Sequence, residues 1–176
     1  MKNKTYPWYH DVNLFTLKEF LKYCTEKYSD DIAFSFKVKK AICNKTYSDF
    51  NKDVELLGSY IFDLIGIYNN VAVLGENSYE WVLSYFSIAN SGNVVVPIDK
   101  EISVLEVENI LKDTDSKILF YANSYKDFAE QIEKDKINIK LINMQDILLN
   151  IIPSLIDQKV NVEKFKNISI KEDDVA

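Results

Sequence analysis

Arginine is absent from this 176-residue chain, whose 21 basic residues are all lysine. Without a guanidinium group, the chain has no bidentate clamp for a phosphate or a carboxylate. Glycine is scarce as well. The four glycines are scattered, and neither Gly-x-x-x-x-Gly-Lys-Ser/Thr nor Gly-x-Gly-x-x-Gly occurs. These absences exclude both common kinds of glycine-rich phosphate loop from the sequence.

Two cysteines, Cys24 and Cys43, and a single histidine, His10, limit metal and redox chemistry. Two cysteines make neither a disulfide framework nor a zinc ligand set, so we expect reduced thiols. His10 has no partner at the spacing of a metal cluster or of a histidine-based catalytic triad. The sequence therefore predicts no metal site.

The net charge and the apolar content of the chain limit the classes of protein to which it can belong. The formal net charge of −6 disfavours nucleic acid as a partner, because phosphate backbones call for a basic surface. No run approaches the roughly 18 to 20 apolar residues of a transmembrane helix, and the amino terminus lacks the apolar core of a signal peptide. With 47% hydrophobic residues, the chain is typical of a globular domain, and we expect a cytoplasmic location.

The stretch 71–99 has the pattern of a strand, a helix and a second strand. Residues 71–74 and 94–96 are short apolar runs of the length of buried strands, and we expect Pro97 to end the second. A helix between two such strands makes them parallel, with a right-handed crossover.

Asn77 is expected to be the N-cap of the helix of this unit, with Glu80 completing a capping box. Residues 81–89 are apolar on nearly all sides, which predicts a helix buried on several faces with Trp81 in the core. Gly92 supplies the stop after the helix.

The same alternation continues toward the carboxyl terminus. Ser103 with Glu106 forms a capping box for the next helix, and Ser124 with Asp127 a weaker cap for the one after it. This pattern predicts an α/β fold with a doubly wound, mostly parallel sheet flanked by helices. The expected strands begin near residues 71, 94, 117 and 139, and the expected helices span 78–91, 103–114 and 125–135.

Before the sheet, the sequence predicts a small antiparallel hairpin between two helices. Thr16 and Glu19 form a capping box for the first helix, Lys39-Lys40 marks the hairpin turn, and Gly66 ends the second helix. The expected elements are an irregular lead-in at 1–15, strands at 32–38 and 41–47, and a helix at 48–65.

After the sheet, a helix is expected at 144–156, and Pro153 inside it predicts a kink or an early end. Residues 158–176 are polar and charged, so we expect a solvated connector there. The length of the chain suits one domain with a core of its own.

Two clusters of charged residues are candidates for function. Asp99, Lys100 and Glu101 follow a predicted parallel strand at its carboxyl end, where open α/β sheets bind ligands; a solvated loop before the Ser103 cap is the alternative. Glu76 and Glu80 have an i, i+4 spacing that would suit a pair of acid–base carboxylates, although a capping role also explains Glu80. No catalytic residue is assigned from these patterns.

Three segments together resemble the amino-terminal portion of AMP-forming acyl-CoA synthetases, and more narrowly the long-chain fatty acid–CoA ligase branch of the adenylate-forming superfamily. The segments are TLKEFLKYCTEKYSDDIAF, KTYSDFNKDVELLGSYIFDLIG and VAVLGENSYEWVLSYFSIANSGNVVVPIDKE. The most diagnostic parts are Gly-Glu-Asn-Ser-Tyr-Glu-Trp at 75–81 and Val-Val-Pro-Ile-Asp at 95–99, and the resemblance covers residues 7–125 best.

The resemblance implies an enzyme that activates a fatty acid or another carboxylic acid with ATP and Mg²⁺ as acyl-AMP, and then transfers the acyl group to coenzyme A. It implies the first subdomain of an acetyl-CoA synthetase-like fold, with residues 99–101 near the CoA nucleotide and Lys100 facing a CoA phosphate. Residues 173–176 resemble the segment ahead of the family's phosphate loop. We therefore expect 1–176 to be truncated before that loop, with no catalytic residue of the family to carry over and no activity alone.

Two other functions stay open: an adenylation domain that feeds a carrier protein, and a stand-alone binding module without catalysis. The parent enzyme of the first reading is expected to be cytoplasmic or peripheral to a membrane. A truncated sheet also predicts an unpaired strand edge, which favours self-association.

Overall fold

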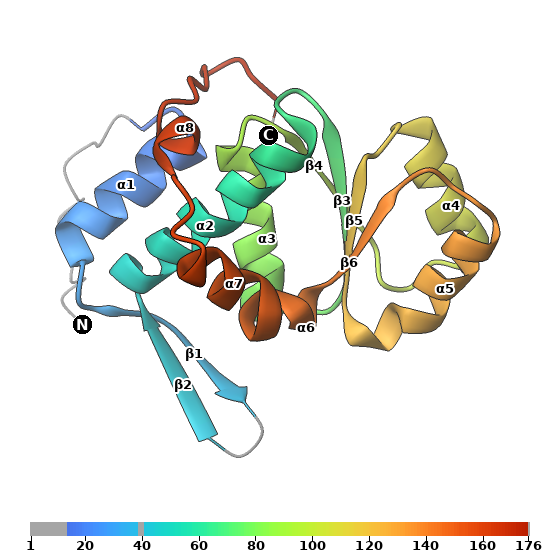
Figure 1. The fold of residues 1–176 in the computed structure, drawn as a ribbon, viewed down its shortest axis with the longest axis horizontal. Coiled ribbons are helices and arrows are strands. Elements are labelled where there is room, and N and C mark those ends of the chain that lie inside the picture. Colours follow the sequence, from blue (N-terminus) through green and yellow to red (C-terminus); the bar gives the residue numbers. More distant parts are fainter. Residues whose placement is uncertain (1–13, 39–40, 176) are drawn as a thin grey trace, which may run out of the picture.

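The structure is a computed structural model, which describes residues 14–38 and 41–175. A four-stranded parallel sheet lies between two groups of helices, and an antiparallel hairpin projects from the body (Figure 1). The strand order is β4-β3-β5-β6. The strands are β3 (Asn70–Leu74), β4 (Val94–Ile98), β5 (Ile118–Tyr121) and β6 (Lys140–Asn143).

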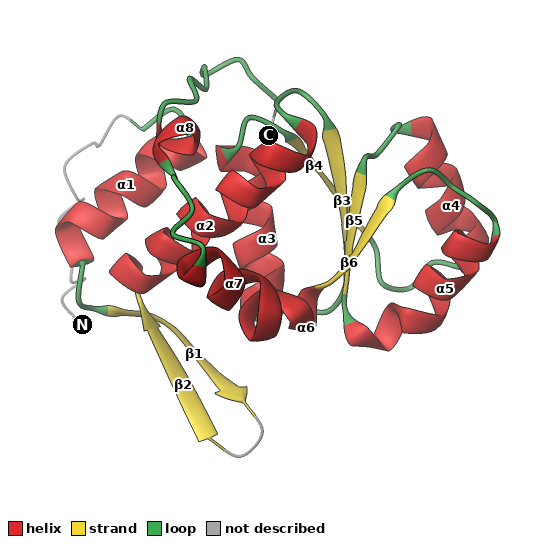
Figure 2. Cartoon of the chain, in the orientation of Figure 1, coloured by secondary structure: helices red, strands yellow, loops and turns green. Residues whose placement is uncertain are grey.

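Helices cover both faces of the sheet, so the predicted doubly wound α/β fold is confirmed (Figure 2). One face carries α1 (Leu17–Tyr28), α2 (Tyr47–Ile65), α3 (Tyr79–Asn90), α7 (Ile152–Asp157) and α8 (Glu163–Lys166). The other face carries α4 (Val104–Asp113) and α5 (Lys126–Lys134). None of the helices in the described ranges is long and apolar enough to cross a bilayer.

Strand β3 shows why the sheet needs helices on both sides. Its side chains alternate between the faces: Val71 and Val73 enter the core beneath α2 and α3, and Ala72 and Leu74 enter the core beneath α4 and α5. All four side chains are buried. A strand that is apolar on both faces cannot meet water on either, which is the usual condition of a parallel sheet.

Side-chain caps define most helix starts. The capping boxes predicted at Thr16–Glu19 and Ser103–Glu106 are both present. A third box, in which Thr46 pairs with Asp49, begins α2 at Tyr47, one residue before the predicted start.

The predicted cap of α3 at Asn77 is wrong. Ser78 is the cap, and its hydroxyl accepts a hydrogen bond from the backbone N–H of Trp81 at 3.1 Å. Glu80 is therefore the second helical residue, too early to close a capping box. Asn and Ser are equally good caps, so the sequence alone does not choose between these neighbours.

Trp81 is also less buried than predicted. It is half-buried and stacks on Tyr85 with ring centroids 5.6 Å apart, whereas Tyr79 takes the core position.

Pro97 does not end β4, which continues to Ile98. The strand tolerates Pro97 because β4 is an edge strand, where a missing N–H breaks no ladder bond.

In place of the kink or early end predicted at Pro153, the helix contains a π-helical turn just before this residue. Residues 144–157 form α6 (Met144–Asp146), a π-helical turn (Ile147–Ile151) and then α7. Proline has no N–H for the i−4 carbonyl, and its ring crowds that carbonyl, so the helix widens just before it.

The hairpin consists of β1 (Ile32–Val38) and β2 (Ala41–Thr46), which pair antiparallel as predicted. Phe34 and Phe36 pack against the core, while Ile32 and Val38 on the same predicted face are exposed. A bulge between Ile32 and Phe34 and the projection of the hairpin from the body explain that difference (Figure 1). The predicted turn at Lys39-Lys40, His10 and most of the predicted lead-in lie outside the described residues.

The segment 158–175 is mostly exposed, yet α8 and the residues just after it are tied to the body. Phe165 of α8 is buried against Gly58 of α2, where an added Cβ would clash with its ring. The ammonium of Lys18 donates to the carbonyl oxygens of Phe165, Lys166 and Ile168 at 2.8–3.0 Å. The sequence predicts a polar connector here, and in the structure Phe165 and Ile168 pack it against the body.

The two edges of the parallel sheet differ in their capacity to pair. Pro97 makes the edge strand β4 a poor partner for an added strand, because proline has no backbone N–H to donate to it. The other edge, β6, carries no proline. We expect the chain to self-associate through β6, with a light-scattering mass that rises with protein concentration. A constant monomer mass up to millimolar concentration would contradict this expectation.

Candidate functional site at the carboxyl edge of the sheet

The carboxyl ends of β3 and β5 lie side by side at the point where the strand order reverses. From β3 the chain crosses first to β4 on one side, and it later returns to β5 on the other side. Open α/β sheets bind ligands at such switch points, because the loops diverge and leave a crevice. The loops that follow Leu74 and Tyr121 therefore define the candidate site.

The two loops approach closely where they leave the sheet. The backbone N–H of Ala122 donates to the carbonyl of Leu74 at 2.9 Å. A Cβ added to Gly75 would lie 2.7 Å from the Cβ of Ala122, so a larger residue would force the loops apart. Glycine at 75 is thus required by the approach of the neighbouring backbone.

Glu76 joins the two loops through Ser124. The Ser124 hydroxyl donates to both carboxylate oxygens of Glu76, at 2.8 and 3.0 Å. The predicted role of Ser124 as a cap for the third sheet helix is wrong, since a 3₁₀ turn (Asn123–Tyr125) precedes α5 and Lys126 begins it. The Ser124 hydroxyl thus holds the Glu76 carboxylate, and no hydrogen bond joins Glu76 to Glu80.

A hollow of about 480 Å³ lies between these loops, within the range of small-molecule sites. We call it the carboxyl-edge hollow. It carries two carboxylates and several neutral polar groups. Its lining residues are Glu76, Ser78, Glu80, Ala122, Asn123, Ser124, Met144 and Gln145.

The predicted site residues Asp99, Lys100 and Glu101 lie at the same edge, after β4. All three are exposed. Asp99 accepts a hydrogen bond from the backbone N–H of Glu101 at 2.9 Å, and the Lys100 carbonyl accepts one from the Tyr125 hydroxyl at 3.0 Å. Tyr125, which the sequence did not point to, thus joins the loop after β4 to the loop after β5.

The carboxyl edge is acidic. Partial burial, followed by the nearby charges of Glu76, Asp99 and Glu101, raises the pKa of the Tyr125 hydroxyl. Among the described residues, no group of three or more acidic, cysteine or histidine side chains has the geometry to hold a metal ion. The described residues of this edge therefore offer hydrogen-bond acceptors and the exposed Lys100, without a glycine-rich loop that could cradle a phosphate.

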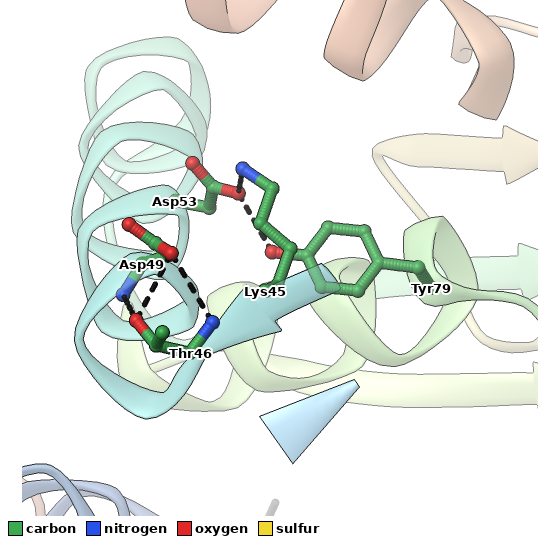
Figure 3. A network of polar contacts seen from close by, with 5 residues as sticks. All are labelled: Lys45, Thr46, Asp49, Asp53 and Tyr79. Carbon is green, nitrogen blue, oxygen red and sulfur yellow. Dashed lines mark hydrogen bonds and ion pairs between the residues drawn. The ribbon is translucent and has the colours of Figure 1, made fainter. Parts of the chain in front are cut away.

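A network of polar contacts among Lys45, Asp53 and Tyr79 holds the start of α3, next to the carboxyl-edge hollow (Figure 3). The carboxylate of Asp53 on α2 is nearly buried, and its Oδ2 atom lies 2.6 Å from both the ammonium of Lys45 on β2 and the hydroxyl of Tyr79 on α3. A carboxylate removed from water needs such partners, and two charge-assisted hydrogen bonds provide them.

The Tyr79 ring fixes the start of α3 through apolar contacts as well. It stacks on Phe36 with centroids 4.8 Å apart and meets Phe34 and Phe50 edge to face. Tyr79 directly follows Ser78, the helix cap that lines the carboxyl-edge hollow. The hairpin, α2 and the edge loop are thus held together at one residue.

Replacing Tyr79 by Phe removes the hydrogen bond to Asp53, and we expect it to lower the free energy of unfolding by about 1.5–3 kcal/mol at neutral pH. Burial, then the hydrogen bond to Asp53 and its charge, raise the pKa of Tyr79 in the folded chain, while in the unfolded chain it stays about 10. Because the pKa of this group is higher in the folded chain than in the unfolded chain, its full contribution to stability is present below the unfolded-state pKa. This contribution is lost as the pH rises from the unfolded-state pKa through the folded-state pKa.

The difference in the free energy of unfolding between wild type and Tyr79→Phe should therefore shrink above pH about 10, by about 1.4 kcal/mol per pH unit. Urea unfolding between pH 8 and 11 measures it. Tyr68→Phe, at an exposed tyrosine, is the matched control and should show no such slope. A difference between wild type and Tyr79→Phe that stays constant with pH would refute the role given to the phenol.

Comparisons with known proteins agree with this fold. The AMP-binding enzyme family matches residues 21–176. Surfactin synthase subunit 1 of Bacillus subtilis is 30% identical over 89 residues, which cover 50% of this chain and 2% of that protein. A medium-chain acyl-CoA ligase of Danio rerio is 27% identical over 135 residues, which cover 70% of this chain and 21% of the ligase.

A solved fatty acyl CoA synthetase of Mycobacterium tuberculosis superposes with a TM-score of 0.73 at 19% identity, over 93% of this chain and 32% of that one. The chain thus spans about a third or less of the length of these three proteins. Since the family match extends over most of its residues, from Leu21 through the whole sheet, the chain belongs to the AMP-binding enzyme family.

Proposed function

We propose that this chain is the amino-terminal part of an acid–thiol ligase that activates a fatty acid with ATP as acyl-AMP and transfers the acyl group to coenzyme A. The observation that carries the proposal is the family match over residues 21–176. Similarity to a medium-chain acyl-CoA ligase over 70% of the chain supports the acyl-CoA branch. A carboxylate is a poor electrophile, and joining it to AMP supplies the leaving group that a thiol can displace.

The residues of this chain do not fit the triphosphate or its Mg²⁺. The sequence has no arginine and no glycine-rich loop, and the carboxyl edge is acidic. We propose that residues 1–176 form the first part of one adenylation domain and that the phosphate loop lies outside them. In this proposal the carboxyl edge forms part of the wall of the reaction site, and none of its residues takes part in phosphoryl transfer.

A second candidate is an adenylation domain that passes its acyl group to a carrier protein. The observation that favours it is the similarity to surfactin synthase subunit 1 over half of the chain. The two candidates share the adenylation step and differ in the thiol acceptor, which this part of the family fold leaves open.

The chain alone should not form acyl-AMP, because it lacks a cradle for the phosphates. With ATP, Mg²⁺, a fatty acid and coenzyme A, we expect pyrophosphate release to stay at the level of buffer. Turnover above that level, absent when the chain is omitted and retained through repurification, would overturn the proposal that the phosphate loop lies elsewhere.

The loop 99–101 is proposed to lie beside the CoA nucleotide, with Lys100 facing a phosphate. A single exposed lysine contributes about 0.2–1 kcal/mol, so we expect CoA to bind weakly and to shift the amide signals of 99–101 and 123–125. Lys100→Ala should weaken this binding up to about fivefold. Lys134→Ala, at the far end of α5, is the control. Equal affinities of both variants would remove Lys100 from the proposed site.

A further inference from the structure

The 3₁₀ turn after β5 makes a side-chain hydrogen bond at the carboxyl end of each of the three other strands. We call this turn (Asn123–Tyr125) the edge turn. Its middle residue reaches the loop after β3, where the Ser124 hydroxyl donates to the carboxylate of Glu76. Its last residue reaches the loop after β4, where the Tyr125 hydroxyl donates to the carbonyl of Lys100 at 3.0 Å.

The first residue of the edge turn reaches the end of β6. The side-chain oxygen of Asn123 accepts a hydrogen bond at 3.2 Å from the side-chain amide of Asn143, the last residue of that strand. The Oδ1 atom of Asn143 in turn accepts from the backbone N–H of Gln145 at 2.9 Å and so caps α6. Three consecutive residues therefore bond to the ends of three different strands.

The geometry of a 3₁₀ helix explains how one short turn reaches three places. It has three residues per turn, so successive side chains point about 120° apart. The edge turn is itself attached to the sheet, because the backbone N–H of Ala122 donates to the carbonyl of Leu74 at 2.9 Å. The ring of Tyr125 packs edge to face on Phe128, with centroids 5.5 Å apart, so its hydroxyl lies at the end of an anchored ring.

The loops that the edge turn contacts after β3 and β4 are exposed. Residues 76–78 and 99–101 all lie at the surface. Loops with few packed side chains open locally at little cost, so a single side-chain hydrogen bond has a large share in fixing their position. Asn123 and Ser124 also line the carboxyl-edge hollow, whose shape therefore depends on the same contacts.

We propose that Asn123, Ser124 and Tyr125 are positioning residues of the reaction site, which hold the ends of β3, β4 and β6 in fixed places around the carboxyl-edge hollow. The inference rests on the proposed function for the ligand, since that function places the loop 99–101 beside the CoA nucleotide. Tyr125 acts through Lys100, because its hydroxyl fixes the backbone that carries the lysine side chain.

Amide hydrogen exchange tests the three contacts separately and needs no ligand. Each place has a reporter amide whose N–H is held by a side chain close by. The reporters are Trp81 after β3, Glu101 after β4 and Gln145 after β6. Each variant should speed exchange at one reporter roughly two- to tenfold, the range for the loss of one hydrogen bond. The pairs are Ser124→Ala with Trp81, Tyr125→Phe with Glu101, and Asn123→Ala with Gln145.

Two matched variants are controls for these substitutions. Ser124→Thr keeps the hydroxyl and should restore slow exchange at Trp81. Tyr68→Phe removes an exposed phenol before β3 and should leave all three reporters unchanged. Asn123 and Ser124 are exposed, so the urea midpoints of their alanine variants should stay close to that of wild type.

Titration of the ¹⁵N-labelled chain with CoA tests the link to the reaction site. Tyr125→Phe should weaken CoA binding up to about tenfold, as followed by the amide shifts of residues 99–101, because the competent position of the loop is less populated. Tyr68→Phe should bind CoA like wild type.

Several results would overturn the inference. Unchanged exchange at all three reporters would mean that the edge turn holds none of these places. Equal acceleration of every reporter in every variant would mean a general loosening of the fold, without positioning of particular loops. Equal CoA affinity of Tyr125→Phe and wild type would remove Tyr125 as a positioning residue.

The two experiments separate this inference from the proposed function. Absence of any CoA shift in wild type would count against the proposed CoA site, and the exchange experiment would still decide on the edge turn. Should Tyr125→Phe fail to fold, the exposed positions Asn123 and Ser124 decide, since unchanged exchange in both alanine variants would contradict the inference.

Discussion

Burial of β3 on both faces is the constraint on which the rest of this structure depends. Its four core residues send alternate side chains into two separate hydrophobic cores, and the neighbouring strands β4 and β5 hydrogen-bond to its two edges. A strand in this position needs a helical layer above and below, and the crossover helices α3 and α4 supply these layers in turn. The reversal of strand order beside β3 then creates the crevice at its carboxyl end.

The two ends of the sheet differ in chemistry. At the carboxyl edge, Glu76, Ser124 and the loop 99–101 make an open, acidic surface whose loops are joined by hydrogen bonds. At the amino-terminal ends of the strands, a hollow of about 450 Å³ is lined mainly by apolar side chains, and Asn90 in its wall is buried. The Lys45–Asp53–Tyr79 network ties the hairpin to the first end, and Lys18 with Phe165 ties the carboxyl-terminal segment to the second. One helix, α3, contributes to both: Ser78 precedes its first turn and Asn90 ends its last.

Local features of the fold could be predicted from the sequence. Apolar runs place every strand of the parallel sheet within a residue or two, and the capping boxes at Thr16 and Ser103 involve residues three apart, so short-range rules identify them. Sequence alone leaves the start of α3 open by one residue, because two good caps, Asn77 and Ser78, stand side by side. The sequence pattern ends β4 too early, at Pro97, because a strand tolerates proline only at the edge of a sheet. Whether a strand lies at an edge is a property of the assembled sheet and cannot be read from the local sequence.

Long-range contacts could not be predicted in this way. Ser124 reads locally as a cap, but its partner Glu76 is 48 residues away and meets it only once β3 and β5 are neighbours. Asp53 looks like a surface acid on an amphipathic helix, and it is buried because Lys45 and Tyr79 converge on it. Phe165 lies in a polar segment, and its burial depends on the space left by Gly58. Asp99, Lys100 and Glu101 were correctly placed at the carboxyl end of a parallel strand, and their role in binding CoA stays a prediction.

Native-state amide hydrogen exchange tests the central place of β3 most directly, because it reports the free energy of opening at each backbone N–H. The account predicts that the amides of Val71–Leu74 exchange only through global unfolding, with a free energy equal to that from urea denaturation, while those of the projecting β1–β2 hairpin exchange by local opening at lower cost. Exchange of the β3 amides as fast as that of the hairpin amides would contradict it.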